Sequence, residues 1–257
     1  MEYILIGLIT FLGAGLTLFS GFGLGTLLMP VFGIFFPIEI AIALTAIVHF
    51  SNNLIKLGFY YRHIDWKIIV RFGIPSVIAA FIGAYFLNTL ANSNPILTYT
   101  LYEKVKIITP MKLTIALLLL IFSLIELIPK LSGMQFDKKY MPLGGLLSGF
   151  FGGLSGNQGA LRSSFLIRAG LSKELFIGTG VVIACLVDIT RLSLYASTTL
   201  KSIDSTKMTL LTFAVLCAFL GVYIGNKVVK KITIKTLQIF VAIVLLLFSA
   251  LLGSGII

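Results

Sequence analysis

A run of small, amide and basic residues interrupts one of the most apolar stretches of the chain. The segment from Met141 to Ile167 has the composition of a membrane helix, yet its middle reads Ser-Gly-Asn-Gln-Gly at 155–159 and a full positive charge follows at Arg162. A charge at mid-membrane costs at least about 2.5–3.5 kcal/mol, so such a residue should face a cavity or a polar partner. The stretch FSGFGLGTL at 19–27 repeats the glycine and serine theme in the first half of the chain.

These two runs predict that a helix breaks inside the bilayer. A break leaves backbone N–H and C=O groups unpaired, and each costs several kcal/mol unless protein or a water-filled cavity satisfies it. The free N–H groups and partial positive charge at the start of the second half-helix bind oxyanions, and glycine lets the ligand approach the backbone. Two such ends that face each other would form one central anion pocket. The residues predicted to line it are Ser20, Gly21, Gly23, Thr26, Ser155, Gly156, Asn157, Gln158, Gly159 and Arg162.

Purely structural interpretations of the same residues stay open. Ser155 and Gln158 have capping-box spacing and could only close a helix end. The glycines could serve only close packing between helices, as in small-xxx-small seams. Arg162 could pair with Asp188 as a structural ion pair.

A second polar group is predicted on the next helix of each half. Asn53, Lys56 and Tyr60 are spaced i, i+3, i+7 and share one helix face, and Asp188, Arg191 and Tyr195 repeat that spacing. Lys56 and Arg191 could attract anions towards the pocket as part of a binding route that includes Asn53. Alternatively, Asp188 and Arg191 form a local ion pair and Lys56 extends to the membrane interface near Arg62, and this structural interpretation is slightly favoured.

Asp188 is the carboxylate most deeply placed in an apolar segment, which makes it the candidate for proton coupling. Its neighbour Arg191 argues against that role, because a nearby cation holds a carboxylate ionised. His49 is expected to be a hydrogen-bonded core residue rather than a proton relay. The chain has 2 histidines and no H-E-x-x-H motif or acidic pair within a helix. The sequence therefore predicts no catalytic residue, no metal site and no cofactor, and we do not expect an enzyme.

The composition assigns the chain to the class of membrane proteins. Of its 257 residues 58% are hydrophobic and 11% are charged, with a mean hydropathy of +1.07, whereas a soluble domain has about 25% charged residues. The net charge of +11 could suggest a nucleic-acid partner, but the Lys and Arg mostly lie in short gaps between apolar segments. That distribution follows the positive-inside rule, so the expected partner is the lipid bilayer and not nucleic acid.

The order of residues predicts an internal duplication. A shift of 135 residues places Ser20 on Ser155, Lys56 on Arg191 and Tyr60 on Tyr195, and after a short insertion GAY at 83–85 meets GVY at 221–223. The predicted fold is an all-α polytopic membrane protein with two inverted repeats of 8–10 helical segments in total, at residues 1–130 and 141–257 with a linker at 131–140. The apolar segments are expected at 3–36, 38–61, 68–90 and 111–129, and then at 141–170, 174–199, 207–227 and 236–257.

The first segment of each half is too long for one crossing. A helix over 3–36 would measure roughly 51 Å against a hydrocarbon core of about 30 Å. If every segment crosses once, the two faces of the membrane receive nearly equal numbers of Lys and Arg. If both first segments are hairpins that return to their starting side, one face receives roughly twice as many as the other. The hairpin arrangement places both termini outside the plasma membrane and makes the two repeats inverted, which is a transporter design.

Three stretches carry a resemblance to a known family. SGFGLGTLLMP, LTAIVHFSNNLIKL and GGLSGNQGALRSSFLIRAGLSKELFIGTGVV resemble the sulfite exporter family of membrane proteins, of the TauE/SafE type, also called the toluene sulfonate uptake permease family. The resemblance covers nearly the whole chain and implies transport of a small sulfur oxyanion or organosulfonate. The chain departs from the family's Gly-Gly-Gly-rich second motif at Asn157, Gln158 and Ala160, so side-chain amides are expected to contribute to its pocket.

Residues and resemblance together predict a carrier for sulfite, thiosulfate or an organosulfonate that works by alternating access. Backbone N–H groups, hydroxyl groups and amides would satisfy the anion's oxygens, and Arg162 would supply the fixed charge, preferably as a bidentate donor. The alternatives are a passive anion channel, a membrane scaffold, or a transporter of another small carboxylate or oxyanion.

Overall fold

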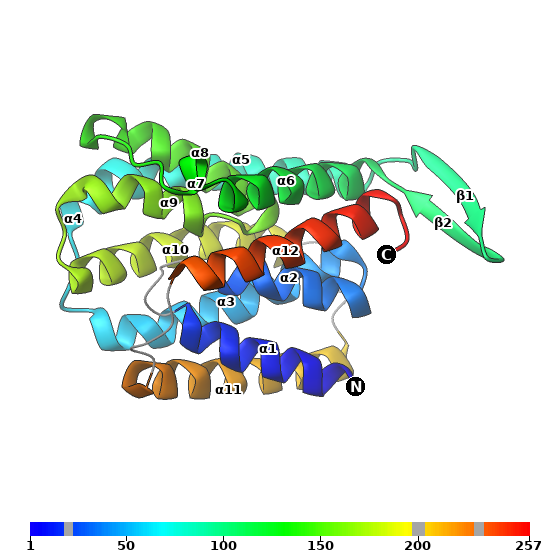
Figure 1. Ribbon diagram of the computed structural model, residues 1–257, viewed down its shortest axis with the longest axis horizontal. Helices are drawn as coiled ribbons and strands as arrows, with labels where there is room; N and C mark the ends of the chain where they lie inside the picture. The colour runs from blue at the N-terminus through cyan, green and yellow to red at the C-terminus, as the bar shows by residue number, and fades with distance from the viewer. Residues whose placement is uncertain (18–22, 197–203, 229–233) are drawn as a thin grey trace.

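Long apolar helices lie side by side along most of the protein (Figure 1). The computed structural model describes residues 1–17, 23–196, 204–228 and 234–257. Within them, 5 helices are long and apolar enough to cross a membrane. These spans are Ile38–Tyr60, Trp66–Ala91, Pro110–Leu127, Lys173–Ala196 and Lys207–Lys227. The all-α polytopic membrane class predicted from the sequence is therefore confirmed.

The predicted single crossings match observed helices closely. Most of their bounds fall within two or three residues of the apolar segments, because composition alone marks where lipid contact ends. The second of them begins as α4 (Trp66–Ile68), which Asp65 caps by accepting from the amide of Ile68 at 3.1 Å. It continues through a π-helical turn into α5. The elements are α3 (Ile38–Tyr60), the π-helical turn Ile69–Gly73, α5 (Ile74–Ala91), α6 (Pro110–Leu127), α10 (Lys173–Ala196), α11 (Ser205–Val228) and α12 (Ile234–Gly253).

The first segment of each half is broken, as predicted. The first consists of α1 (Glu2–Leu16) and α2 (Leu24–Phe35), and the second of α8 (Met141–Ser155) and α9 (Gly159–Leu166), which a 3-10 turn at Ile167–Ala169 extends. A helix of 15 residues, such as α1 or α8, is roughly 22 Å long and is too short to cross the hydrocarbon core alone.

The second broken segment folds back on itself. The amide of Phe136, shortly before α8, donates to the carbonyl of Ser164 in α9 at 3.2 Å. The Phe165 ring lies against Gly144, near the start of α8. The end of α9 therefore lies beside the beginning of α8, which is a hairpin.

Helices of the two halves pack against each other in a reciprocal pattern. Helix α1 packs against α11 and α8 packs against α5, while α3 packs against α10 and α6 against α12. If the halves are exchanged, with α1 for α8, α3 for α10, α5 for α11 and α6 for α12, the contact of α1 with α11 becomes that of α8 with α5. The contacts of α3 with α10 and of α6 with α12 each map onto themselves.

Glycines allow the closest of these contacts. A Cβ built on Gly83 of α5 would lie 2.2 Å from the carbonyl oxygen of Phe150 in α8. A Cβ built on Gly221 of α11 would lie 2.2 Å from the carbonyl oxygen of Phe11 in α1. Gly83 and Gly221 are the two glycines that the sequence comparison aligns in GAY and GVY. In both seams the helix backbones touch, as in small-residue interfaces of membrane helices.

A β-hairpin interrupts the helical order and was not predicted. Strands β1 (Leu97–Leu101) and β2 (Lys104–Ile108) are joined by Tyr102 and Glu103, whose φ angles are both positive at 48° and 62°. A two-residue turn with two positive φ angles normally contains Asn-Gly or Asp-Gly. The sequence Tyr-Glu at 102–103 therefore does not indicate a hairpin. Figure 1 shows the hairpin at the same end of the bundle as both chain termini, with α4 at the opposite end. Two short helical pieces precede α8: α7 (Pro129–Ser132), which overlaps the start of the predicted linker, and a 3-10 turn at Lys138–Tyr140 within it.

Candidate functional site

The start of α2 meets the break between α8 and α9 in the interior of the protein. Gly23 precedes α2 with a φ of 115°, and Gly156 ends α8 with a φ of 81°, both in the region that favours glycine. A Cβ built on Gly25, in the first turn of α2, would lie 3.7 Å from the carbonyl oxygen of Gly156 and 3.3 Å from the His49 ring. The first turn of α2 thus adjoins the break of the second hairpin, beside α3.

An ion-pair network on α3 and α10 lies next to these breaks. The Asp188 carboxylate is fully buried, and it lies 2.8 Å from Nη2 of Arg191 and 2.7 Å from Nδ1 of His49. Asn53 donates to the same carboxylate at 3.5 Å. The predicted local pair of Asp188 and Arg191 is therefore present, and His49 is a hydrogen-bonded core residue as expected.

The same network holds α10 against the break of α8. Arg191 is fully buried, and its Nη1 would lie 2.7 Å from a Cβ on Gly156. One turn further, the Tyr195 hydroxyl donates to the carbonyl of Gly153 at 2.9 Å. Arg191 and Tyr195 of α10 therefore lie against the end of α8.

Lys56 does not extend to the membrane interface, so that expectation is wrong. Its side chain is only 5% exposed, and its ammonium group donates to the carbonyl of Thr17 at 3.5 Å. Thr17 follows the last residue of α1, and helix C-termini attract cations. The interior carbonyl at the end of the half-helix draws Lys56 inwards.

Lys56 and Arg162 line one cavity. The other polar residues in its lining are Asn53 and Ser163, and none of the described lining residues is acidic. Arg162 is 4% exposed, and its guanidinium donates to Oε1 of Gln158 at 3.3 Å. Two like charges that line one enclosed cavity repel each other. The cavity measures about 20 Å³, which is room for roughly one water molecule.

Amide side chains at the second break contain buried polar atoms with no hydrogen-bond partner in the described chain. Both polar atoms of the Asn157 side chain and Nε2 of Gln158 are in this state. Gln158 is the N-cap of α9 but makes no side-chain cap bond, and the Ser155 hydroxyl donates back to Phe151 at 3.1 Å. The capping-box interpretation is therefore wrong. These amides are available to another partner.

The remaining predicted residues fall into three groups. Ser20 and Gly21 lie outside the described residues. Gly159 is the first residue of α9, which begins four residues after Ser155, and Thr26 lines a second small cavity with Asn157. Tyr60, at the end of α3, contacts the apolar cluster of Ile177, Val181 and Cys185.

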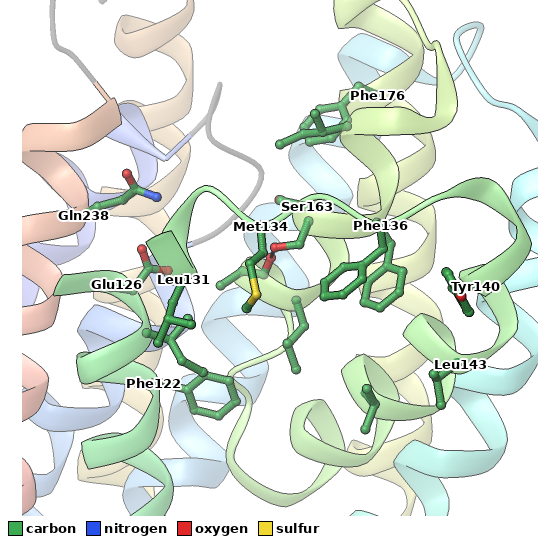
Figure 2. A pocket seen from close by; sticks show the side chains of 17 residues that line it. Phe122, Glu126, Leu131, Met134, Phe136, Tyr140, Leu143, Ser163, Phe176 and Gln238 are labelled. Atoms are coloured by element: carbon green, nitrogen blue, oxygen red, sulfur yellow. Dashed lines mark hydrogen bonds between the residues drawn. The ribbon is translucent and has the colours of Figure 1, made fainter. Parts of the chain in front are cut away.

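A much larger cavity of about 550 Å³ adjoins the second hairpin, and Figure 2 shows it between the end of α6 and the segment that leads into α8. Its lining is mostly apolar and aromatic. Ser163 and Phe176 also line the cavity of Lys56 and Arg162. Glu126 and Gln238 line it on α6 and α12. The sequence pointed to none of these four as site residues, since single Ser, Phe, Gln or Glu residues at helix ends have no distinctive spacing.

Broken helices that meet in a polar interior, surrounded by apolar spans, define a polytopic helical membrane protein with the features of a transporter. The chain belongs to the sulfite exporter TauE/SafE family, which matches residues 5–252. It is thus a member of a family of membrane transporters for sulfur anions, and the family predicted from its motifs is confirmed. No curated protein and no solved structure matches the chain.

Proposed function

We propose that the protein moves a small sulfur oxyanion across the plasma membrane and binds it between Lys56 and Arg162. The observation that supports this most strongly is the shared cavity, which has two buried cations and no acidic residue in its described lining. Two like charges in an enclosed site repel each other, and an anion between them turns that repulsion into attraction. Sulfite, thiosulfate and sulfonates each offer several oxygens to such a site.

The neighbouring groups would satisfy the rest of the anion. Arg162 can donate two parallel hydrogen bonds, and the side chains of Asn53 and Ser163 face the same cavity. The amides of Asn157 and Gln158 and the N-terminal amides of α9 lie at the adjoining break. A helix N-terminus adds partial positive charge.

An inverted duplication underlies this proposal. Support comes from the reciprocal packing of the helices and from Gly83 and Gly221, which make equivalent contacts. A third observation is the hydrogen bond from Asn53 to Asp188 at 3.5 Å. These two residues are counterparts under the shift of 135 residues, and counterparts touch where they lie close to a two-fold axis. In this proposal the two-fold axis passes beside the breaks.

The orientation follows from charge. The end of the bundle that carries α4, the connection before α8 and the start of α12 has the greater share of the Lys and Arg of the described residues, so we assign it to the cytoplasm. Both termini and the β-hairpin would then lie outside.

Alternating access is supported by a difference between the two hairpins. Helix α2 packs against α12, where Gly33 contacts the Phe248 ring. The exchanged contact would join α9 and α6, but residues of both helices line the 550 Å³ cavity instead. We infer that this is the inward-facing state, with the large cavity as the cytoplasmic vestibule. In the outward-facing state α9 would close onto α6 and α2 would leave α12.

The site at Lys56 and Arg162 must also widen. A cavity of about 20 Å³ does not admit an anion of four or more heavy atoms. Since Ser163 and Phe176 separate it from the vestibule, movement of α9 or of the start of α10 would connect the two.

The test compares two arginines of the same segment in proteoliposomes. Arg162→Ala should weaken uptake of labelled sulfite roughly 10- to 150-fold, because a charged hydrogen bond is worth about 1.5–3 kcal/mol. Arg168→Ala removes the same charge from an exposed pair with Asp137 and should leave uptake nearly unchanged. Undiminished uptake by Arg162→Ala, with the protein folded, would refute the binding site.

The same liposomes separate a carrier from a passive channel. A carrier should exchange external labelled sulfite for unlabelled sulfite inside, and the rate should saturate with concentration. A thermal-shift screen of sulfite, sulfate, thiosulfate and sulfoacetate would rank the anions, since a bound ligand stabilises the folded state in proportion to its occupancy. A rate that stays linear in concentration would contradict the carrier.

A further inference from the structure

Glu126 is a buried carboxylate near the end of α6. It is 9% exposed, and its Oε2 has no hydrogen-bond partner in the described part of the chain. The side chain of Gln238 on α12 hydrogen-bonds to the carboxyl group. Figure 2 shows both side chains at one wall of the large cavity. A buried carboxyl oxygen without a partner is costly, so its retention needs an explanation.

Glu126 lies between two cavities. It lines the vestibule of about 550 Å³ and also a cavity of about 10 Å³ whose lining includes Thr26 and Asn157. The smaller space is close to the volume of a single water molecule. Asn157 adds an amide group whose two polar atoms have no partner in the described residues. The Glu126 carboxyl group thus has a wide cavity on one side and a space the size of one water molecule on the other. It can exchange a proton with water in either cavity.

Among the described residues that line its two cavities, Glu126 is the only charged one. In the linings of its two cavities, α12 contributes Gln238, Val241 and Leu245, and α2 contributes Thr26. The 3-10 turn before α8 contributes Tyr140, which is the other titratable group among the described lining residues. Asp188, the sequence-based candidate for proton coupling, contacts both Arg191 and His49. Glu126 is therefore better placed to change its protonation without breaking an ion pair.

Helix α9 connects Glu126 with the cavity of Lys56 and Arg162. Ala160 lines both cavities of Glu126, while Arg162 lines the cation-lined cavity. Residues two positions apart lie on nearly opposite faces of a helix. A negative carboxylate on one face of this short helix and a bound anion on the other raise each other's energy, so protonation of Glu126 favours binding of the anion.

We propose that Glu126 is the proton site of this transporter and binds one proton for each anion moved. The proposal depends on the proposed function. The carboxylate takes up a proton from the vestibule or from the water-sized cavity, becomes a neutral carboxylic acid while the anion is bound, and returns the proton when the anion leaves. No bond other than O–H forms or breaks.

The test uses Glu126→Gln, which keeps the shape and the hydrogen bond to Gln238 but cannot titrate. Proteoliposomes are loaded with unlabelled sulfite, and counterflow of labelled sulfite is measured without a pH gradient. Accumulation is then measured with the external side acidic, and passive entry into protein-free liposomes is subtracted. For one proton per monovalent anion, the wild type should accumulate label about tenfold per pH unit. Glu126→Gln should show counterflow but no accumulation, and the exposed Glu103→Gln in the β-turn should behave as wild type.

The outcomes separate the two proposals. Absence of counterflow in the wild type contradicts the proposed function. Counterflow with accumulation by Glu126→Gln equal to wild type overturns the proton site alone, as does accumulation that follows a Na⁺ gradient instead of pH. An infrared pH titration of the detergent-solubilised protein needs no substrate: the carbonyl stretch of a buried carboxylic acid should appear in the wild type and be missing in Glu126→Gln. Identical spectra would also overturn the assignment.

Discussion

The glycine seam between α5 and α8 makes a quantitative prediction about stability. A methyl group on Gly83 would lie 2.2 Å from the carbonyl oxygen of Phe150 and 3.0 Å from the amide nitrogen of Leu154. Both contacts are with backbone atoms of a packed helix, so no side chain can rotate away. The helices would have to separate by about 1 Å to reach an ordinary contact distance. We expect Gly83→Ala to lower the free energy of unfolding by about 1–3 kcal/mol, the usual cost of overpacking.

Gly58 provides the matched control. A Cβ built at this exposed position of α3 meets nothing within 4 Å. Alanine is favoured over glycine in a helix by about 0.8–1.0 kcal/mol, so Gly58→Ala should be neutral or stabilising. Gly221→Ala, the counterpart in the seam of α1 and α11, should resemble Gly83→Ala, because its Cβ would lie 2.2 Å from the carbonyl oxygen of Phe11.

The assay uses a thiol that the protein already contains. Cys185 is buried and Cys217 is partly buried, so a thiol-reactive dye reports thermal unfolding in detergent. The reasoning is refuted if Gly83→Ala unfolds at the same temperature as Gly58→Ala. If Gly83→Ala is destabilised but Gly221→Ala is not, the result supports close packing at Gly83 but contradicts the equivalence of the two halves.

Two further predictions concern the ion-pair network and the orientation. Asp188→Asn should destabilise the protein by about 3–5 kcal/mol in the same assay, because it leaves buried Arg191 without its charge partner, whereas Asp137→Asn at an exposed pair should change stability by less than about 1 kcal/mol. With both native cysteines replaced, Tyr102→Cys in the β-turn should react with an impermeant maleimide only from outside, and Met134→Cys at the vestibule only from inside; labelling of both from one side would overturn the assigned orientation.

Sequence alone predicted the spans and the breaks because both are set by local composition. Apolar length fixes where α3 or α10 crosses, and the glycines at 23 and 156 supply backbone angles that other residues avoid. The β-hairpin could not be predicted, since Tyr102 and Glu103 are unusual in its turn. Its position depends instead on contacts with the chain's end, where Lys106 donates to the carbonyl of Ile256 at 2.6 Å.

The residue types of the candidate site were predictable from the sequence, but the contacts that their side chains make were less so. Asp188 and Arg191 are close in sequence, so their pairing follows from helical spacing. The contact of His49 with Asp188 joins residues 139 positions apart and depends on how α3 packs against α10. Lys56 was misplaced for the same reason: its helix position suggested the interface, whereas the carbonyl at Thr17 belongs to another helix.

The two cations of the cavity are connected to different broken segments, and this has a consequence for transport. Lys56 bonds to Thr17 at the end of α1 in the first broken segment, while Arg162 belongs to α9 in the second. Movement of α9 relative to α3, the helix that carries Lys56, would therefore change the separation of the two charges. The attraction between an anion and each cation falls with distance and with entry of water. We infer that the step that opens the site to one side also lowers its affinity for the anion, so that release requires no separate displacing group.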